Sequence, residues 1–209
     1  MHTRPNVLQL FSQSGLSEMP GKQAKTLSAD HISDLLFFAE RSRHPLRNRL
    51  VVLLSVKAGL RAAEIAKLTW AMLLDPSGEV GSTLEVRDEI AKKRSGRSIP
   101  IHPELRQALV EARRLCDGHG PLIRSERGGA MTPMSIVVWF SRAYDELGFE
   151  GCSSHSGRRT FITRAARSVH KAGGSLRDVQ LLAGHRSIQT TQRYIDGDSD
   201  AQRRLISLI

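Results

Sequence analysis

The chain has 209 residues, 40% of them hydrophobic, and its 31 Lys and Arg outnumber 21 Asp and Glu to give a formal net charge of +10. This length suits one domain with a real core and argues against a multidomain machine. The apolar runs are far shorter than the ~20 residues that a bilayer span needs, and two cysteines are too few for a disulfide framework or a zinc site. The positive charge predicts a polyanionic partner, nucleic acid ahead of an acidic membrane surface, and we expect a cytoplasmic protein without membrane association.

The first part of the chain is expected to be a polar arm followed by helices. Residues 1–26 are rich in Ser, Gln, Gly and Lys without a sustained period, which predicts a flexible arm. Ser28 is suited to cap a first helix, and Pro45 is suited to open a second one that ends at Gly59 in a left-handed conformation. A short helix is expected over residues 62–68.

A small sheet and further helices are predicted for the rest. Residues 83–87 and 97–101 alternate between polar and apolar side chains and favour Thr, Val and Ile, which predicts an antiparallel hairpin. Helical spacing with Pro or Ser start signals and Gly stop signals then recurs. The expected helices begin at Pro103 and Pro133 or cover residues 156–171, 175–183 and 187–195. The sequence therefore predicts a mainly α-helical fold with one small antiparallel β-sheet.

One string that can carry chemistry is S-S-H-S-G-R-R-T-F at residues 153–161. It places His155 and Arg158 three residues apart at the start of a helix, so that both side chains share one face. The free amides and the positive dipole end of a helix favour an anion at this position. On its own, however, the string is more often a capping histidine followed by an exposed arginine.

Two further strings favour a functional interpretation of His155 and Arg158. A-G-L-R-A-A-E puts Arg61 at a helix mouth with Glu64 three residues later, where the carboxylate can orient the guanidinium. L-L-A-G-H-R-S-I-Q-T-T-Q-R-Y-I places His185 in a tight turn and Tyr194 nine residues later, across a short helix. In isolation, the first pair could be a surface ion pair, and the tyrosine could be a packing aromatic.

Taken in order, these strings resemble the catalytic domain of the tyrosine recombinases, or phage-type integrases, over roughly residues 27–195. The resemblance implies the mainly helical DNA breaking and rejoining fold, with its small sheet. The residues that match the family's catalytic positions are Arg61, Lys92, His155, Arg158, His185 and Tyr194. Lys92 is matched because it stands eight residues before Pro100 in K-K-R-S-G-R-S-I-P-I, although Lys93 is a close alternative.

The resemblance implies that two arginines bind the scissile phosphate and that Tyr194 is the nucleophile. Forked guanidinium donors suit the charge that grows on a phosphodiester during attack. A tyrosine with a pKa of ~10 needs a base, for which His155 is the candidate, and the leaving 5'-hydroxyl needs a proton, for which Lys92 is the candidate. His185 would donate a hydrogen bond to the same phosphate. The product would be a 3'-phosphotyrosyl link, formed without metal, ATP or any other cofactor.

Further residues and partners are expected around this site. Glu64 would support the site, and the DNA-contacting cations would be Lys93, Arg94, Arg97, Arg159 and Arg186. Double-stranded DNA would be the partner of a homo-oligomer, a synaptic tetramer, with a nucleoid-associated location. Typical members carry a helical core-binding domain in front, which we expect to be absent here, so the catalytic domain would cover residues 27–209. The chain would then be a compact enzyme or a fragment, or an accessory protein would supply the second grip on DNA.

Two other functions fit parts of the sequence. Residues 175–195 can form a helix-turn-helix of a noncatalytic DNA-binding regulator, with residues 187–195 as its recognition helix. This alternative leaves as coincidences the matches at Arg61, at Lys92 and at the pair of His155 and Arg158. A type IB topoisomerase-like enzyme would keep the chemistry but relax DNA as a monomer. Either enzyme would form a covalent adduct with DNA, and the regulator would not. A recombinase would exchange strands only between matched sites, whereas a topoisomerase-like enzyme would relax DNA without them.

Overall fold

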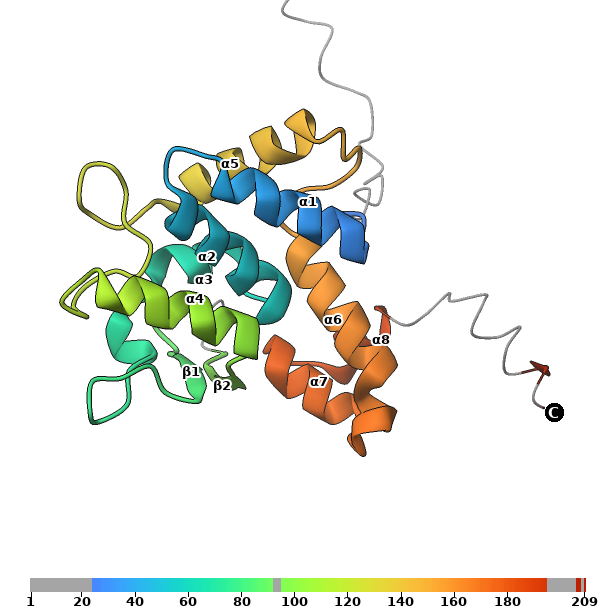
Figure 1. Cartoon of the computed structure of the whole chain (residues 1–209). Coiled ribbons are helices and arrows are strands. Elements are labelled where there is room, and N and C mark those ends of the chain that lie inside the picture. Colours follow the sequence, from blue (N-terminus) through green and yellow to red (C-terminus); the bar gives the residue numbers. More distant parts are fainter. Residues whose placement is uncertain (1–23, 92–94, 195–205, 208) are drawn as a thin grey trace, which may run out of the picture.

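The computed structural model describes residues 24–91, 95–194, 206, 207 and 209, so Lys92, Lys93 and Arg94 lie outside the described residues. Helices dominate the described chain, and one two-stranded sheet accompanies them (Figure 1). The longer helices are α1 (Ala29–Glu40), α2 (Pro45–Lys57), α4 (Pro103–Arg114), α5 (Pro133–Glu146), α6 (Ser156–Ser168) and α7 (Leu176–Ala183). The shorter elements are α3 (Ala62–Lys67), α8 (Ile188–Gln192), the 3-10 turns η2 (Trp70–Met72) and η3 (Val169–Ala172), and the strands β1 (Thr83–Val86) and β2 (Arg97–Pro100). The predicted fold class is confirmed.

Local signals explain where the helices begin and end. The Ser28 side chain accepts a hydrogen bond from the His31 amide at 3.0 Å and so caps α1. Pro45 occupies the first turn of α2, where its missing N–H costs no hydrogen bond. Gly59 and Gly184 follow α2 and α7 with φ of 63°, a left-handed conformation that glycine adopts without strain. Both glycines directly precede segments that carry predicted site residues.

The main core is built around α2. Residues Leu50 to Leu54 of this helix are all buried, because α1, α4 and α6 pack on different sides of it (Figure 1). The strands pair antiparallel with Leu84 opposite Ile99, and both of these side chains are buried. The hairpin is thereby held against the helical core, as the alternating pattern predicts.

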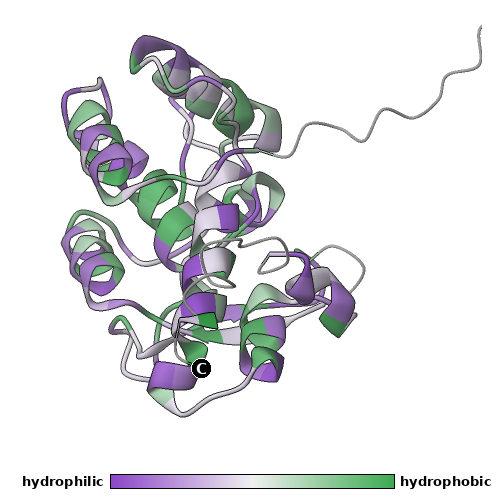
Figure 2. Cartoon of the chain, turned by 90° about the vertical axis from the view of Figure 1, so that its right-hand side faces the viewer, coloured by the Kyte–Doolittle hydropathy of each residue, from purple (hydrophilic) through white to green (hydrophobic). Residues whose placement is uncertain are grey.

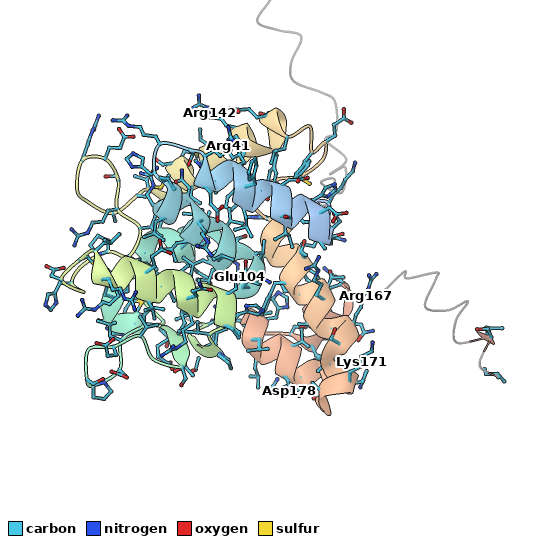
Figure 3. All side chains as sticks on the ribbon, viewed as in Figure 1. Arg41, Glu104, Arg142, Arg167, Lys171 and Asp178 are labelled. Atoms are coloured by element: carbon cyan, nitrogen blue, oxygen red, sulfur yellow. The ribbon has the colours of Figure 1, made fainter. Side chains whose placement is uncertain are left out.

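A second, smaller apolar cluster holds the last helices together. It consists of Ile162, Ala166, Val169, Val179 and Ala183, contributed by α6, η3 and α7. Most helices carry both hydrophobic and hydrophilic stretches (Figure 2), which suits elements with one buried and one exposed side. Charged side chains such as Arg142, Arg167 and Lys171 project from the outside of the molecule (Figure 3). None of the helices within the described ranges combines the length and apolarity needed to cross a membrane.

A close helix contact fixes α6 against α2. A Cβ atom added to Gly157 would lie 3.0 Å from Ser55 Cβ and 3.1 Å from Val56 Cγ1, so this position leaves no room for a larger side chain. The chain before α1 lies along α6, where the Leu27 amide donates to Thr160 Oγ1 at 2.7 Å. The Lys25 amide donates to the Gly151 carbonyl at 3.0 Å, so the end of the predicted arm is held against the folded chain, and residues 1–23 lie outside the described part.

Candidate active site

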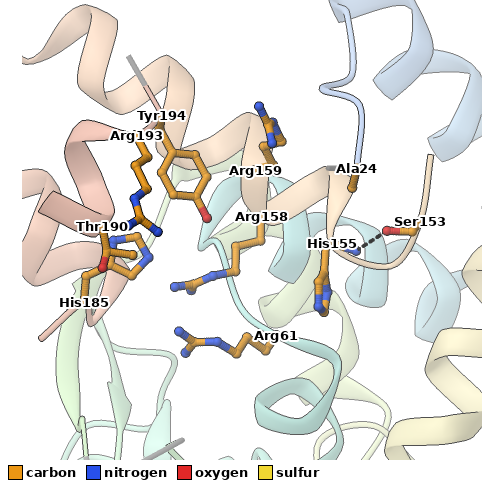
Figure 4. A pocket seen from close by; sticks show the side chains of 10 residues that line it. All are labelled: Ala24, Arg61, Ser153, His155, Arg158, Arg159, His185, Thr190, Arg193 and Tyr194. Atoms are coloured by element: carbon orange, nitrogen blue, oxygen red, sulfur yellow. Dashed lines mark hydrogen bonds between the residues drawn. The ribbon is translucent and has the colours of Figure 1, made fainter. Parts of the chain in front are cut away.

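Five of the residues predicted to be catalytic line one open pocket of about 600 Å³. They are Arg61, His155, Arg158, His185 and Tyr194, and Figure 4 shows their side chains around a common space. They come from the start of α3, the start and first turn of α6, the turn after α7 and the residues after α8. The fold thus brings together side chains that lie up to 133 positions apart in the sequence.

Arg61 is held by Glu64, as the spacing predicts. The Glu64 carboxylate accepts from the Arg61 guanidinium at 2.9 Å and from the Arg61 amide at 2.9 Å. The Glu64 side chain is 1% exposed, and burial alone would raise the pKa of its carboxyl. Hydrogen bonding and charge from Arg97, and then from Arg61, outweigh burial and hold this pKa below its usual range. Glu64 is therefore an ionised carboxylate that fixes the Arg61 guanidinium.

Arg97 lies beneath the pocket, which corrects its expected place among the DNA-contacting cations. Its side chain is 5% exposed and donates to the two Glu64 carboxylate oxygens at 3.1 Å each. Its Nε donates to the carbonyl of Leu182 at 2.9 Å, at the end of α7. All three guanidinium nitrogens thus donate hydrogen bonds to acceptors within the protein. Arg97 links β2 to α3 and to the turn that carries His185.

Arg158 is also buried and bridges two segments. It is 5% exposed, and it donates to the carbonyls of Gly59 at 2.6 Å and Ala183 at 2.7 Å. Burial, followed by the charge of Arg61, lowers the pKa of Arg158 to about 10, which leaves the guanidinium charged at neutral pH. Arg158 therefore lines the pocket and also connects the segment before Arg61 to the end of α7.

The two predicted histidines lie in different surroundings. His155 directly precedes α6 and is exposed. Its backbone amide donates a hydrogen bond to the Ser153 hydroxyl at 3.3 Å. His185 lies on the other side of Arg61 and Arg158 (Figure 4), where burial and then the charge of Arg158 lower its pKa to about 4. His185 is therefore a neutral imidazole at neutral pH.

Hydrogen bonds fix His185 in place. The Gln180 side chain donates to the His185 carbonyl at 2.8 Å, and the His185 amide donates to the Gln180 carbonyl at 3.1 Å. The ring Nδ1 lies 3.0 Å from the Thr191 hydroxyl. Sequence reasoning missed both Gln180 and Thr191 as supporting residues. The adjacent threonines in the T-T-x-x-Y string were the available signal for the second of them.

Tyr194 lies over the His185 ring. The two rings are stacked at 5.6 Å between centroids and 24° between planes, and the Arg159 guanidinium lies 5.9 Å from the phenol ring centroid. The Tyr194 hydroxyl points into the pocket, on the side of Arg158 (Figure 4). Arg159 thus lines the pocket, as a DNA-contacting cation would, and Arg186 is exposed beside it.

The charges around the pocket do not balance. Arg61, Arg97 and Arg158 carry three positive charges close together, and Glu64 supplies the buried carboxylate that faces them. Within the described residues this cluster is positive by two charges. An excess of positive charge on fixed guanidiniums at a concave surface suits an anionic ligand such as a phosphodiester.

Sequence relatives share most of this chain. Tyrosine recombinase XerC of Mesorhizobium japonicum is 33% identical over 158 residues, which are 73% of this chain and 47% of the relative. Tyrosine recombinase XerC of Brucella suis biovar 1 is 28% identical over 204 residues, which are 91% of this chain and 62% of the relative. The chain spans about half the length of the curated relatives that it matches.

Solved structures have the same fold. XerA recombinase superposes with a TM-score of 0.68 at 25% identity, over 90% of this chain and 66% of that one. The Tn1549 transposon integrase in complex with a circular intermediate DNA superposes with a TM-score of 0.69 at 20% identity, over 91% of this chain and 67% of that one. The sequence model of the phage integrase family matches residues 25–200. The chain therefore belongs to the phage integrase family, and its fold is that of a tyrosine recombinase catalytic domain.

Proposed function

We propose that this chain is the catalytic part of a site-specific DNA recombinase that cuts and rejoins DNA through a 3'-phosphotyrosyl intermediate. The observation that carries the proposal is the meeting of Arg61, Arg158 and His185 with the phenol of Tyr194 in one positively charged pocket. A regulator that only bound DNA would have no need for a tyrosine stacked on an imidazole beside two guanidiniums (Figure 4).

The phosphate would bind where the positive charge is uncompensated. Arg61 retains 24% exposure of its side chain and so can offer donors to a ligand while Glu64 holds its position. Arg158 lies behind it and stabilises charge on the nonbridging oxygens without moving, because its two bonds to backbone carbonyls fix it. Removal of one fixed donor of this kind typically costs a factor of ~10² to 10³ in rate.

The reaction would exchange one phosphoester bond for another. The Tyr194 oxygen forms a bond to phosphorus as the bond from phosphorus to the 5'-oxygen breaks, so no energy source is needed. The phenol proton goes to a base, for which His155 is the candidate at the start of α6. The 5'-oxygen takes a proton from Lys92 or Lys93 on the hairpin. His185, as a neutral imidazole, donates a hydrogen bond to the phosphate throughout.

Double-stranded DNA is the proposed partner. The Tn1549 integrase was solved with DNA, and this chain carries a net charge of +10 together with pocket-lining Arg159 and exposed Arg186. Lys93 and Arg94 would add contacts from the hairpin. Recombination between two sites would require a homo-oligomer, a tetramer at synapsis, and a further domain or an accessory protein would supply a second grip on DNA.

A suicide substrate tests the proposal directly. The protein is incubated with a nicked duplex that carries the inverted repeats found beside its gene, and a denaturing gel is used to detect a covalent adduct. We expect an adduct with the wild type and none with Tyr194→Phe. Tyr144→Phe is the matched control, because Tyr144 is buried in the main core and its hydroxyl has no hydrogen-bond partner within the described residues.

The same experiment separates the other functions. A DNA-binding regulator would bind the duplex but form no adduct in any variant, and that result would overturn the proposal. Helix α8 covers only five residues, Ile188–Gln192, which is short for a recognition helix. Relaxation of supercoiled plasmids without a cognate site would instead indicate a topoisomerase-like enzyme, whereas strand exchange between matched sites alone would support a recombinase.

A further inference from the structure

The contact between Thr191 and His185 has a chemical consequence. Thr191 belongs to α8, is fully buried, and places its hydroxyl 3.0 Å from Nδ1 of His185. A neutral imidazole carries one proton, so one ring nitrogen is a donor and the other is an acceptor. The partner of Nδ1 therefore decides which of these two forms Nε2 takes.

We propose that Thr191 is a positioning residue that donates its hydroxyl proton to Nδ1 of His185 and thereby keeps the ring proton on Nε2. The inference rests on the proposed function, in which Nε2–H donates to the scissile phosphate. The opposite tautomer would present a lone pair to the phosphate oxygens, and like partial charges would repel. Thr191 would thus act on the reaction through His185 without touching DNA.

The direction of this hydrogen bond follows from burial. Within the described residues, the structure gives the Thr191 hydroxyl one hydrogen-bond partner, Nδ1 of His185. If Nδ1 carried the proton, the hydroxyl would accept it and its own hydrogen would lose that acceptor in a buried place, which costs free energy. The ring is neutral because burial and the charges of Arg158 and Arg61 lower its pKa to about 4. At neutral pH the single ring proton can therefore occupy either Nδ1 or Nε2.

The remaining freedom of the His185 ring is already restricted. Two hydrogen bonds with Gln180 fix its backbone, and the stacked ring of Tyr194 covers one face. The carbonyl of Thr191 also accepts from the Tyr194 amide at 3.0 Å. These contacts fix the position of the His185 ring and the orientation of its plane. The Thr191 hydroxyl therefore controls the remaining property, which is the nitrogen that carries the ring proton.

Nuclear magnetic resonance of the free protein tests the tautomer without any catalysis. Two-bond correlations between ring protons and nitrogens in protein labelled with ¹⁵N-histidine distinguish the two forms at pH 7. We expect His185 to carry its proton on Nε2 in the wild type and in Thr191→Ser, which keeps the hydroxyl. Thr191→Val keeps the shape and should show a population with the proton on Nδ1. A wild-type ring protonated on Nδ1, or an unchanged tautomer in Thr191→Val, would overturn the proposal.

Cleavage rates on the suicide substrate provide the second measurement. Thr191→Val should slow adduct formation ~10-fold, less than the ~10² expected for loss of the whole donor in His185→Ala. Thr191→Ser should stay within about twofold of the wild type, because its hydroxyl can make the same bond. In a His185→Ala background, Thr191→Val should have no further effect, since a positioning residue loses its influence when its target is gone.

The outcomes distinguish this inference from the proposed function. An equal slowing by Thr191→Val with and without His185 would mean that Thr191 supports Tyr194 or the fold, and the inference would be wrong. A wild type that forms no adduct at all would overturn the proposed function, while the resonance experiment would still decide the tautomer. Thermal unfolding of each variant shows whether a rate change arises from lost structure.

Discussion

The molecule uses two different ways to hold its segments in place. Around α2, apolar side chains fill the interior on several sides, and Leu50 to Leu54 are all buried. The part that consists of α6, η3, α7 and α8 has only a small apolar cluster of its own. Helix α6 packs directly on α2, whereas the end of α7 is attached to the rest by charged and polar groups. Arg158 binds the carbonyls of Gly59 and Ala183, and Arg97 binds that of Leu182.

This difference shows how the site is assembled. The main core supplies rigidity through burial, which is insensitive to the exact position of any one hydrogen bond. The turn that carries His185 is instead held by two guanidiniums, that of Arg158, which lines the pocket, and that of Arg97, which supports Glu64 beneath it. Positioning and chemistry are therefore coupled in the second region, and a change in one of these arginines should alter both. The following tests measure that contrast, from the largest expected effect to the smallest.

Leu53→Ala should cause the largest loss of stability. Leu53 is fully buried in the centre of the main core, and truncation of such a leucine typically lowers the free energy of unfolding by ~2 to 5 kcal/mol. Denaturant unfolding followed by circular dichroism measures this loss. Val52→Ala in α2 and Val179→Ala in the small cluster form the matched pair, because both remove the same atoms from a buried valine, and a loss at Val179 as large as that at Val52 would contradict the contrast between the two regions.

Arg97→Gln should destabilise the second region selectively. The change removes one partner of the buried Glu64, and breaking a buried ion pair in this way typically costs ~3 kcal/mol or more. Hydrogen exchange should rise in α7 and the following turn while α2 stays protected, because regions of low stability open separately. Adduct formation should fall as well, since Glu64 and the turn both support pocket residues.

Arg114→Gln is the control for this experiment. Arg114 is exposed at the end of α4, away from the pocket residues, so the same loss of charge should leave exchange in α7 unchanged. Uniform loss of protection across α2 and α7 in Arg97→Gln would show that the two regions unfold as one unit, contrary to our expectation.

Gly157→Ala should disturb the contact between the two regions. The new Cβ would lie 3.0 Å from Ser55 Cβ, and overpacking of this kind typically costs ~1 to 3 kcal/mol. We expect a lower melting temperature and slower cleavage, since α6 carries Arg158. The double variant Gly157→Ala with Ser55→Gly should be more stable than the sum of the two single losses predicts, because Ser55→Gly carries its own cost inside α2. Strictly additive losses would rule out this contact as the cause.

The last test is the pH dependence of stability, which depends on a single half-buried imidazole. The pKa of His185 falls from an ordinary value of 6.5 to about 4 in the folded protein, so the unfolded chain binds the proton more readily. The contribution of neutral His185 is complete above pH 6.5 and is lost as the pH falls towards 4. In His185→Gln, the decline in unfolding free energy over this range should be shallower. An unchanged slope would show that His185 titrates at its ordinary pKa.

Local structure and the identity of the family could be read from the sequence, because both depend on residues near one another in the chain. The caps at Ser28 and Pro45 and the stop at Gly59 act within a single turn of helix, and the structure has each of them where it was expected. The strings around Arg61 and His185 likewise each lie within a short stretch of the chain, so the resemblance was visible without coordinates.

Glu64 as the partner of Arg61 followed from the spacing, but the partners of Arg97, Arg158 and His185 were decided by the tertiary structure. Arg97 was expected at the DNA surface, yet it pairs with Glu64, 33 positions away, because the fold brings the start of β2 close to the first turn of α3. The bond from Arg158 to Gly59 spans 99 positions, and the contact of Thr191 with His185 depends on how α8 folds back over the turn. A spacing pattern records which groups are present, whereas burial and long-range packing determine which of them meet and which remain free to bind a ligand.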